Sequence, residues 1–236
     1  MDVVSATNLV KTYRTGEIDV PAVRGATFTI EAGGFVAFVG PSGSGKSTLL
    51  NMIGCLDRPT GGTLRVLDTD VARLDRRSAA NFRGRHIGFV FQDFNLIPVL
   101  TVFENIEYPL LMVQHWDERR RREQVQRLLD AVDMTAQAGK RPDQISGGQK
   151  QRVAIARALA TQPQLVLADE PTANLDRETA RRIIALMRDM RDRLGTTFVF
   201  STHDPNIMAA AEATYRVEDG IVSTHASADR RETAHV

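Results

Sequence analysis

Short apolar runs that alternate with helical patterns organise most of the chain. The runs at residues 34–40, 164–170 and 196–203 are rich in β-branched or aromatic residues and too short for core helices, so we expect each to form a buried strand. Residues 178–195 carry apolar side chains three and four positions apart and end at Gly195, which predicts an amphipathic helix. Strands that alternate with helices predict an α/β domain with a parallel sheet.

Three other regions have different patterns. Residues 94–161 are helical in pattern without a convincing strand, and we expect them to form a helical subdomain inserted into the α/β body. Residues 3–30 alternate like antiparallel strands, and residues 215–223 predict two short strands joined at Asp219-Gly220. We therefore expect one domain over residues 1–223, followed by a polar, flexible tail at residues 224–236.

Composition is that of an ordinary soluble protein. Of the 236 residues, 42% are hydrophobic, and 30 Lys plus Arg oppose 29 Asp plus Glu, so no overall charge points to nucleic acid. The basic run at residues 117–127 is typical of a solvated helix face. With no apolar stretch of roughly 20 residues, no signal-peptide pattern and Cys55 as the single cysteine, we expect a cytosolic protein that contacts a membrane only through a partner.

A glycine-rich loop at residues 40–48 follows the first predicted strand and precedes a helical pattern. It reads GPSGSGKST and matches G-x-x-x-x-G-K-[ST] in the strand–loop–helix context that this motif requires. Its glycines let the backbone wrap a polyphosphate, the lysine reaches the β and γ oxygens, and the following serine hydroxyl ligates Mg²⁺. A chance glycine-rich turn is the alternative, which the flanking elements disfavour. The predicted phosphate-binding residues are Gly40, Pro41, Ser42, Gly43, Ser44, Gly45, Lys46, Ser47 and Thr48.

Two carboxylates end the second predicted strand. Asp169 is placed to hold Mg²⁺, directly or through water, if its strand lies parallel to the strand before the glycine-rich loop. Glu170 follows it and could orient or deprotonate an attacking water; the alternative is a solvated loop carboxylate. Phosphoryl transfer needs mainly positioning and charge neutralisation, so this small set of groups is chemically sufficient.

The segment Ser146-Gly147-Gly148-Gln149 opens a run that is otherwise rich in good helix formers. Each glycine inside a helix costs about 1 kcal/mol relative to alanine. Either Ser146 caps the helix and the glycines only turn the chain, or bare N–H groups at the helix N-terminus form a socket for an anion.

Taken together, these motifs resemble the ATP-binding subunits of ABC transporters over residues 3 to about 223. The family's Walker A motif corresponds to residues 40–48, its LSGGQ signature to residues 145–149 (ISGGQ), and its Walker B motif to residues 165–170. Residues 173–176 match the D-loop. The resemblance implies a P-loop NTPase fold, with a RecA-like parallel sheet core, an N-terminal antiparallel β subdomain and an inserted α-helical subdomain.

The same resemblance implies roles for individual residues, with ATP and Mg²⁺ as cofactors. Gln92 in FVFQD matches the glutamine that reaches the metal and the attacking water, and Tyr13 matches the aromatic residue that stacks on adenine. His203 matches the switch histidine that contacts the γ-phosphate and helps position Glu170. Packing is the alternative role for Tyr13, and a satisfied core histidine is the alternative for His203. The implied catalytic set is Glu170, His203, Lys46 and Gln92, and the implied metal set is Ser47, Gln92 and Asp169.

The family pattern also implies partners. Two cassettes close head to tail, and each presents residues 146–149 to the ATP held by the other, so this chain needs a second cassette, most simply its own copy. A separate integral membrane permease would hold it at the cytoplasmic face of the inner membrane, with a periplasmic or extracytoplasmic adaptor as a further candidate partner. No nucleic acid is expected. Because few residues follow the last strand pair, we expect no C-terminal regulatory domain of the kind that many sugar importers carry.

Finer likeness points to a branch of the family. Residues 40–62 and 89–111 look like the branch of macrolide-efflux (MacB) and lipoprotein-releasing (LolD) ATPases, with the cell-division ATPase FtsE nearby. Gly34, residues 65–71 and Lys150 depart from its usual pattern, which leaves the substrate open. A soluble ABC ATPase acting on DNA or ribosomes is the alternative, although such proteins usually carry long insertions or two cassettes. We expect residues 94–100 to dock the permease, with internal packing as the alternative.

Overall fold

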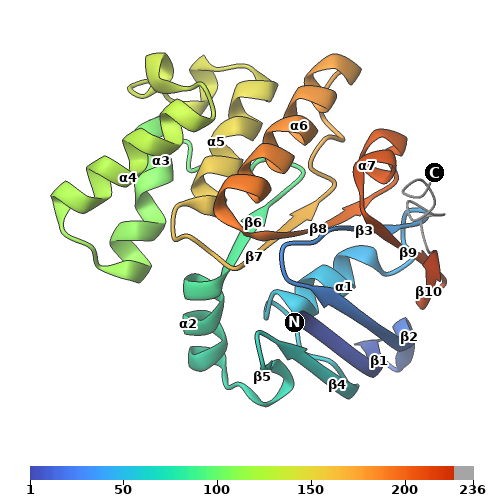
Figure 1. The fold of residues 1–236 in the computed structure, drawn as a ribbon. Helices are drawn as coiled ribbons and strands as arrows, with labels where there is room; N and C mark the ends of the chain where they lie inside the picture. The colour runs from blue at the N-terminus through green and yellow to red at the C-terminus, as the bar shows by residue number, and fades with distance from the viewer. Residues whose placement is uncertain (226–236) are drawn as a thin grey trace, which may run out of the picture.

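A computed structural model describes residues 1–225, which form two sheets surrounded by helices (Figure 1). The predicted tail lies outside the described residues, except that Thr224 and His225 belong to strand β10 (Ile221–His225), so the last strand extends further than the sequence pattern predicts.

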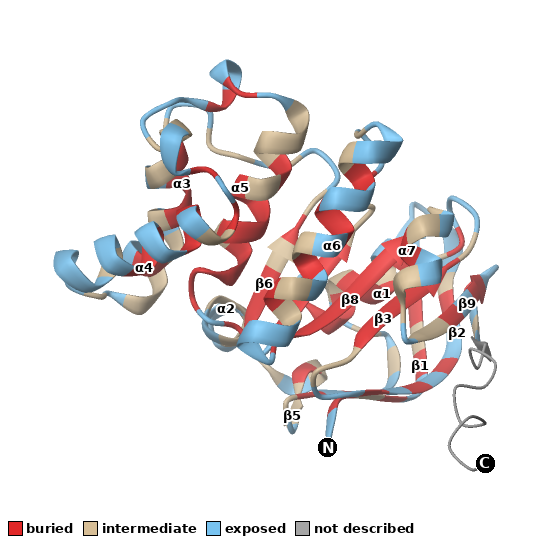
Figure 2. Ribbon diagram, turned by 45° about the horizontal axis from the view of Figure 1, so that its top comes forward, coloured by how far each residue is buried: buried red, intermediate tan, exposed pale blue. Residues whose placement is uncertain are grey.

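The central sheet contains the three predicted buried strands. Its order is β10-β9-β3-β8-β7-β6, in which β3 (Phe35–Val39), β8 (Thr197–Thr202) and β7 (Leu165–Asp169) are parallel neighbours. Each has helices or other strands over both faces, so its residues are almost all buried (Figure 2), which explains the continuous apolar runs. The parallel core is therefore confirmed.

Three further strands complete this sheet. The pattern did not predict β6 (Ile87–Val90), a parallel edge strand beside β7. At the other side, β9 (Ala213–Glu218) runs parallel to β3 and pairs antiparallel with β10 across the predicted Asp219-Gly220 turn. The predicted strand pair is confirmed.

The N-terminal sheet is antiparallel, as predicted. Its order is β2-β1-β4-β5, and its long members are β1 (Asp2–Thr15) and β2 (Ile18–Glu31). The sequence pattern did not predict β4 (Gly61–Val66) or the short β5 (Thr69–Asp70).

Helices cover the sheets and form a group at one side of the molecule (Figure 1). No strand occurs between residues 94 and 161, all of which the structure describes, so the helical character of that segment is confirmed. However, α5 packs against β6 and α6 as well as against α3, so the helical group shares a core with the sheet. The boundary near residue 161 stays a prediction. The α-helices are α1 (Lys46–Ile53), α2 (Arg76–His86), α3 (Val102–Pro109), α4 (Glu118–Ala131), α5 (Gly147–Leu159), α6 (Arg177–Leu194) and α7 (Pro205–Ala210), and the single turns are η1 (Val71–Arg73), the π-helical η2 (Leu110–Gln114), η3 (Thr135–Gln137) and η4 (Pro142–Gln144).

The predicted helix over residues 178–195 is α6. It begins at its cap Asp176, whose side chain accepts from the amides of Glu178 and Thr179, and it ends at Gly195 with φ 66°. Most of the apolar side chains of α6 are buried, as the predicted amphipathic helix requires, but Leu194, the last helical residue, is exposed. None of the helices in residues 1–225 combines the length and the apolar character that crossing a bilayer requires.

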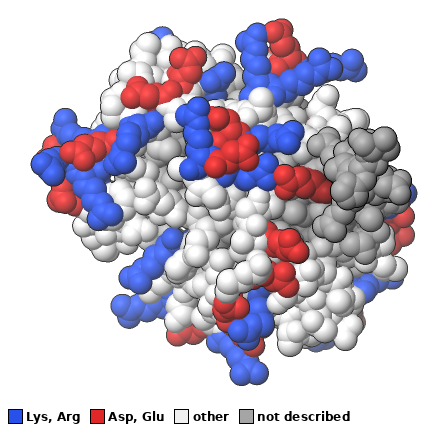
Figure 3. Space-filling model, in the orientation of Figure 1, with Lys and Arg blue, Asp and Glu red and all other residues white. Residues whose placement is uncertain are grey.

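Most of the basic run at residues 117–127 is a solvated helix face, as predicted, although the side chain of Arg121 is only 16% exposed. The run forms α4, where Arg119 pairs with Glu123 and Arg122 pairs with Glu118 at 2.9 Å, all with exposed side chains. The space-filling view shows acidic side chains among the basic ones at this side of the molecule (Figure 3). The run is therefore a mixed-charge surface, and such exposed pairs add little stability.

Candidate functional site

The glycine-rich loop connects β3 to α1, as its motif requires. Three of its glycines have positive φ, namely Gly40, Gly43 and Gly45. A Cβ added to Gly40 would lie 2.0 Å from the carbonyl oxygen of Val217, and one on Gly45 would lie 2.3 Å from that of Ala22. Gly43 has open space around it, so only its backbone conformation demands glycine there.

The β9–β10 turn supports this loop from behind. The Gly220 amide donates to the Ser44 carbonyl at 3.0 Å, and the Gly220 carbonyl accepts from the Arg24 amide at 2.8 Å. Gly220 thus links the loop to β2 of the N-terminal sheet. The sequence interpretation missed this role, because it treated Asp219-Gly220 only as a hairpin turn.

Two side chains of the loop fit a bound polyphosphate. Lys46 is almost completely buried, and its Nζ donates to the carbonyls of Gly40 at 2.9 Å and Pro41 at 2.8 Å, so the ammonium is held over the loop. The Ser44 hydroxyl is buried without a hydrogen-bond partner among residues 1–225. A buried cation and an unsatisfied hydroxyl beside a helix N-terminus suit phosphate oxygens.

Ser47 and Asp169 meet, as a magnesium site requires. The Ser47 hydroxyl donates to Asp169 Oδ1 at 3.0 Å, and the Ser201 hydroxyl donates to the same oxygen at 2.6 Å. They meet because β3, β7 and β8 are parallel neighbours whose carboxyl ends share one edge. Hydroxyl and carboxylate oxygens are the hard ligands that Mg²⁺ prefers, so the residues fit this ion. Sequence reasoning missed Ser201, although it stands opposite Asp169 in the register.

Glu170 and His203 lie next to this pair. His203 Nδ1 is 2.9 Å from Glu170 Oε1. Because a carboxylate only accepts, Nδ1 carries the shared proton. The His203 side chain is 66% exposed, which excludes the satisfied core histidine. Glu170 has φ 44°, and its amide donates to the Ser201 carbonyl at 2.9 Å, so its backbone is tied to the end of β8.

The backbone of Gln92 contacts Asn174, in the segment before α6. Gln92 follows β6, is exposed, and its carbonyl accepts from Asn174 Nδ2 at 3.1 Å. The same amide group donates to Asp93, so the segment after β6 is joined to the segment before α6. The reach of the Gln92 side chain to the metal stays a prediction.

Tyr13 lies at the end of β1 and is 38% exposed. Its hydroxyl donates to Asp57 Oδ2 at 2.7 Å. Burial raises the pKa of this hydroxyl, as does the hydrogen bond to Asp57, whereas a hydrogen bond with the Thr48 side chain lowers it. The Tyr13 hydroxyl is therefore close to Thr48, the last residue of the phosphate loop.

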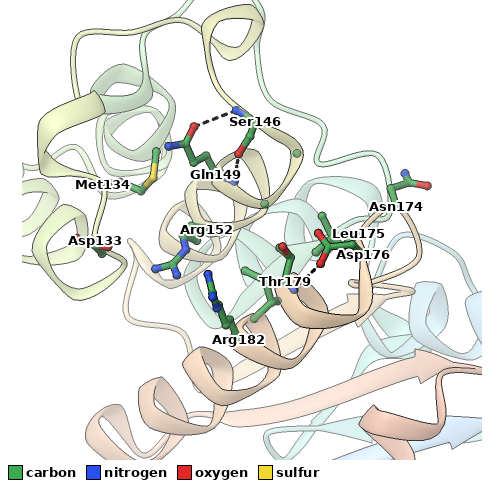
Figure 4. A pocket seen from close by; sticks show the side chains of 13 residues that line it. Asp133, Met134, Ser146, Gln149, Arg152, Asn174, Leu175, Asp176, Thr179 and Arg182 are labelled. Atoms are coloured by element: carbon green, nitrogen blue, oxygen red, sulfur yellow. Dashed lines mark hydrogen bonds between the residues drawn. The ribbon is translucent and has the colours of Figure 1, made fainter.

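The segment Ser146–Gln149 caps α5. Ser146 Oγ accepts from the Gln149 amide at 3.3 Å, and Gln149 Oε1 accepts from the Ser146 amide at 2.9 Å, a reciprocal capping box (Figure 4). The two glycines differ. Nothing crowds Gly147, whereas a Cβ on Gly148 would lie 2.6 Å from Thr179 Cγ2. Gly148 therefore has a packing reason, the close approach of α5 to α6, in addition to any role toward an anion.

This segment lines a cleft of about 480 Å³ between α5 and α6. Polar groups from both helices, including Asp176 and the guanidinium groups of Arg152 and Arg182, surround it (Figure 4). None of its lining residues belongs to the phosphate loop. The chain thus presents an open helix N-terminus in one place and a phosphate cradle in another.

The substitution Gly220→Ala, which adds one methyl group, tests whether the β9–β10 turn supports the phosphate loop. In Gly220→Ala the new Cβ would lie 2.9 Å from the Ala22 carbonyl oxygen, and φ is 78°, so the turn must shift. We expect the dissociation constant for ATP to rise about fivefold, the equivalent of one hydrogen bond. Calorimetric titration measures it. Gly195→Ala is the matched control, since φ is 66° and no atom lies within 4 Å. Equal ATP affinity in both variants would contradict the role of the turn.

Comparison with known proteins agrees with this geometry. The family model described as ABC transporter matches residues 23–173. The lipoprotein-releasing system ATP-binding protein LolD of Anaeromyxobacter dehalogenans is 48% identical over 210 residues, which cover 89% of this chain and 88% of the relative. The macrolide export ATP-binding/permease protein MacB of Rhodopirellula baltica is 45% identical over 90% of this chain. The chain spans about a third of the length of the MacB relatives, 31% in this case.

Solved structures give the same result. The dimeric post-hydrolysis structure of the ATP-binding cassette MJ0796 bound to ADP and Pi matches with a TM-score of 0.88 and 41% identity, covering 96% of this chain and 99% of that one. In sequence, the protein of that name from Methanocaldococcus jannaschii is 44% identical over 91% of this chain and 93% of its own length. The chain therefore belongs to the ABC transporter family, as one of its ATP-binding ATPase cassettes.

Proposed function

We propose that the chain hydrolyses ATP as one of two copies that close head to tail, and that this closure moves a separate membrane permease. The observation that carries the proposal is the separation of two half-sites. The phosphate loop, the Ser47–Asp169 pair and Glu170 form one half, and the capped N-terminus of α5 opens into a different cleft. A second molecule that brings its α5 to this cradle would complete the site.

The first half binds the nucleotide. The loop amides and the Lys46 ammonium would hold the phosphate oxygens, and Ser47 and Asp169 would hold Mg²⁺. When bound, Mg²⁺ neutralises charge on the phosphates. Ser201 fixes the orientation of Asp169 by donating to Oδ1, which leaves the other carboxylate oxygen available.

Glu170 is the proposed base. It accepts a proton from the water that attacks the γ-phosphorus, and the bond between that phosphorus and the leaving oxygen of ADP breaks. His203 donates its Nδ1 proton to Oε1 and so orients the carboxylate. With that proton committed, the other ring nitrogen of a neutral His203 is an acceptor, so contact with a γ-phosphate oxygen requires either protonation of the ring or its release from Glu170.

The second half stabilises the partner's nucleotide. Ser146 and Gly147 stand at the N-terminus of α5, where the helix dipole is positive and the first amides lack intrahelical partners. Gly147 has no atom closer than 3.7 Å to its Cβ position, so an anion could approach the backbone there. This supports the anion socket as an addition to the cap.

The proposed permease dock is an exposed apolar surface around η2. Leu111 and Met112 of η2 and Tyr108 of α3 are exposed. A Cβ on Gly84 would lie 2.7 Å from Val113 Cγ1, so η2 packs closely on α2. Next to α2, a cavity of about 520 Å³ is lined by side chains of that helix and by residues 55–58, including the exposed Leu56.

The loop at residues 94–100 is a second part of the proposed dock. Asn105, fully buried, accepts from the Ile97 amide at 2.8 Å and donates to the Ile97 and Leu100 carbonyls, so the loop is held in one shape. Leu96 packs on the core while Val99 is exposed. We therefore propose that Leu96 serves internal packing and that Val99 contacts the permease.

The relatives suggest the class of system. Identity to LolD and MacB proteins supports the proposal that the partner permease extrudes or releases its substrate, with an extracytoplasmic adaptor as a further candidate partner. In the MacB relatives the name joins ATP-binding and permease functions in one protein of about three times this length. We propose that here the permease is a separate subunit that holds the cassette at the cytoplasmic face of the membrane.

Glu170→Gln tests the catalytic assignment. It keeps the shape of the side chain and removes the base, so we expect hydrolysis to fall at least about a hundredfold while ATP affinity is retained and an ATP-bound dimer accumulates. Phosphate release and analytical ultracentrifugation measure the two effects. Glu123→Gln, an exposed residue of α4, is the control and should match the wild type. Unchanged turnover would refute the assignment of Glu170 as the base. A strictly monomeric ATP-bound variant would refute the proposal that two copies close on ATP.

Leu111→Asp combined with Met112→Asp tests the dock. Charges on an apolar contact surface cost binding, so we expect a tagged double variant to recover at least about tenfold less permease from solubilised membranes than the wild type. Ile221→Asp, which changes an exposed apolar residue on β10, is the control and should recover normal amounts. Equal permease recovery by all three proteins would contradict the dock, and recovery of ribosomes or DNA-repair factors instead would contradict the transporter assignment.

A further inference from the structure

Tyr13 belongs to a hydrogen-bonded cluster with Lys11 and Asp57. Lys11 is two positions before Tyr13 on β1 and is only 8% exposed, although lysine is rarely buried without a partner. Its Nζ donates to Asp57 Oδ1 at 2.6 Å and to the Arg58 carbonyl at 2.8 Å. The other carboxylate oxygen, Oδ2, accepts from the Tyr13 hydroxyl at 2.7 Å. One carboxylate thus joins the ammonium and the phenol.

The cluster fixes the ring in two ways. The hydroxyl is held by Asp57, and Lys11 Nζ lies over the ring, 4.7 Å from its centroid. A planar base can therefore stack only on the ring face that Lys11 leaves free. The ring is the exposed member of the cluster and Lys11 the buried one, so the side that faces solvent is the aromatic side.

Asp57 connects the ring to the phosphate loop. It lies just after α1, the helix that starts inside that loop, and the amides of Leu56 and Asp57 both donate to the Asn51 carbonyl, at 2.8 and 3.1 Å. Asp57 is therefore placed by the same rigid helix that carries Lys46, Ser47 and Thr48. The distance between the ring and the phosphate cradle is set through this helix, as a fixed spacing between a base and its phosphates requires.

The pairing of β1 with the segment after α1 does not need this cluster. The Thr60 amide donates to the Val10 carbonyl at 2.8 Å, and the Thr12 amide donates to Thr60 Oγ1 at 3.1 Å. β1 also pairs with β4 from Val4 to Val10. Partly buried ion pairs are weak sources of stability, because desolvation offsets the attraction. A purely structural reason for the pair is thus poorly supported, and a role toward the ring remains.

The ionisation states suit that role. Although burial raises the pKa of the Asp57 carboxyl, the hydrogen bonds from Lys11, Tyr13 and the Arg58 amide outweigh it, and the pKa lies below its usual value. The pKa of Tyr13 is raised, chiefly by burial. Near neutral pH the carboxylate is charged and the phenol keeps the proton that it donates.

We propose that Lys11 and Asp57 are positioning residues that hold the Tyr13 ring for the adenine base, so that they contribute to binding of the nucleoside part of ATP and not to binding of its phosphates. The inference rests on the proposed function, in which Tyr13 stacks on adenine. Neither residue contacts the reacting atoms, and both act through the ring.

Comparing ATP with inorganic tripolyphosphate tests this directly, because the second ligand has phosphates and no base. Calorimetry gives both dissociation constants for the full chain. For Tyr13→Ala we expect the ATP constant to rise about tenfold, the loss of one stacked base. Asp57→Asn and Tyr13→Phe keep side chains of nearly the same shape, and for each we expect the dissociation constant for ATP to rise about threefold. In all of these variants the tripolyphosphate constant should stay at the wild-type value.

A double variant and a control sharpen the result. Tyr13→Ala with Asp57→Asn should bind ATP no more weakly than Tyr13→Ala alone, because Asp57 acts only through the ring. Asp189→Asn removes a carboxylate that pairs with Arg193 on the exposed face of α6, and it should leave both constants unchanged. If Asp57→Asn fails to fold, Tyr13→Phe still decides, since it removes only a hydroxyl from an exposed ring.

The contrary outcomes are distinguishable. If Tyr13→Ala binds ATP like the wild type, the stacking role in the proposed function is refuted, and so is the inference that depends on it. If Tyr13→Ala weakens ATP binding while Asp57→Asn and Tyr13→Phe do not, only the positioning role is refuted. If Asp57→Asn weakens tripolyphosphate and ATP equally, Asp57 supports the phosphate loop and the inference is wrong.

Discussion

The phosphate loop is confined by backbone on both sides, and the rest of the site depends on that confinement. A methyl group on Gly40 would lie 2.0 Å from the Val217 carbonyl oxygen, and one on Gly45 would lie 2.3 Å from that of Ala22. Only glycine allows β9 of the central sheet and β2 of the N-terminal sheet to approach the loop this closely. The loop conformation is therefore constrained by two other parts of the chain, β9 and β2, and this is the preorganisation that phosphoryl transfer needs.

Parallel pairing then brings the remaining groups to the loop. β3, β8 and β7 are neighbours, so their carboxyl ends deliver Ser47, Asp169, Ser201, Glu170 and His203 to one edge. The residues interact in pairs that fix their orientation. The second half-site, at the N-terminus of α5, is formed differently. A capping box fixes the start of the helix, and Gly148 allows α6 to pack closely against it. The cleft at this N-terminus shares no lining residue with the phosphate loop, which is why a partner copy is central to the proposal.

Much of this could be predicted from sequence, and the failures have physical causes. β3, β7 and β8 were predictable because strands buried on both faces are continuously apolar. α2 could not be predicted, because it has no buried residue and therefore no periodic apolar pattern. β6 could not be predicted either, because its four residues are too few to give a clear strand pattern. Motif residues such as Lys46 and Asp169 were found from local spacing. Ser201, Gly220 and Asp57 were missed because each acts across a long sequence separation: Asp57 is 44 residues from Tyr13. The packing role of Gly148 could not be predicted from the sequence, because its contact residue Thr179 lies on another helix.

The central claim is that one active site needs two molecules, and mixing two defective chains tests it most directly. Lys46→Ala damages the cradle and spares the α5 N-terminus, whereas Ser146→Arg does the reverse. A head-to-tail heterodimer of the two contains one intact composite site and one doubly damaged site. The account predicts that the mixture hydrolyses ATP faster than the sum of the two variants measured separately. A mixture that is no faster than that sum would contradict it.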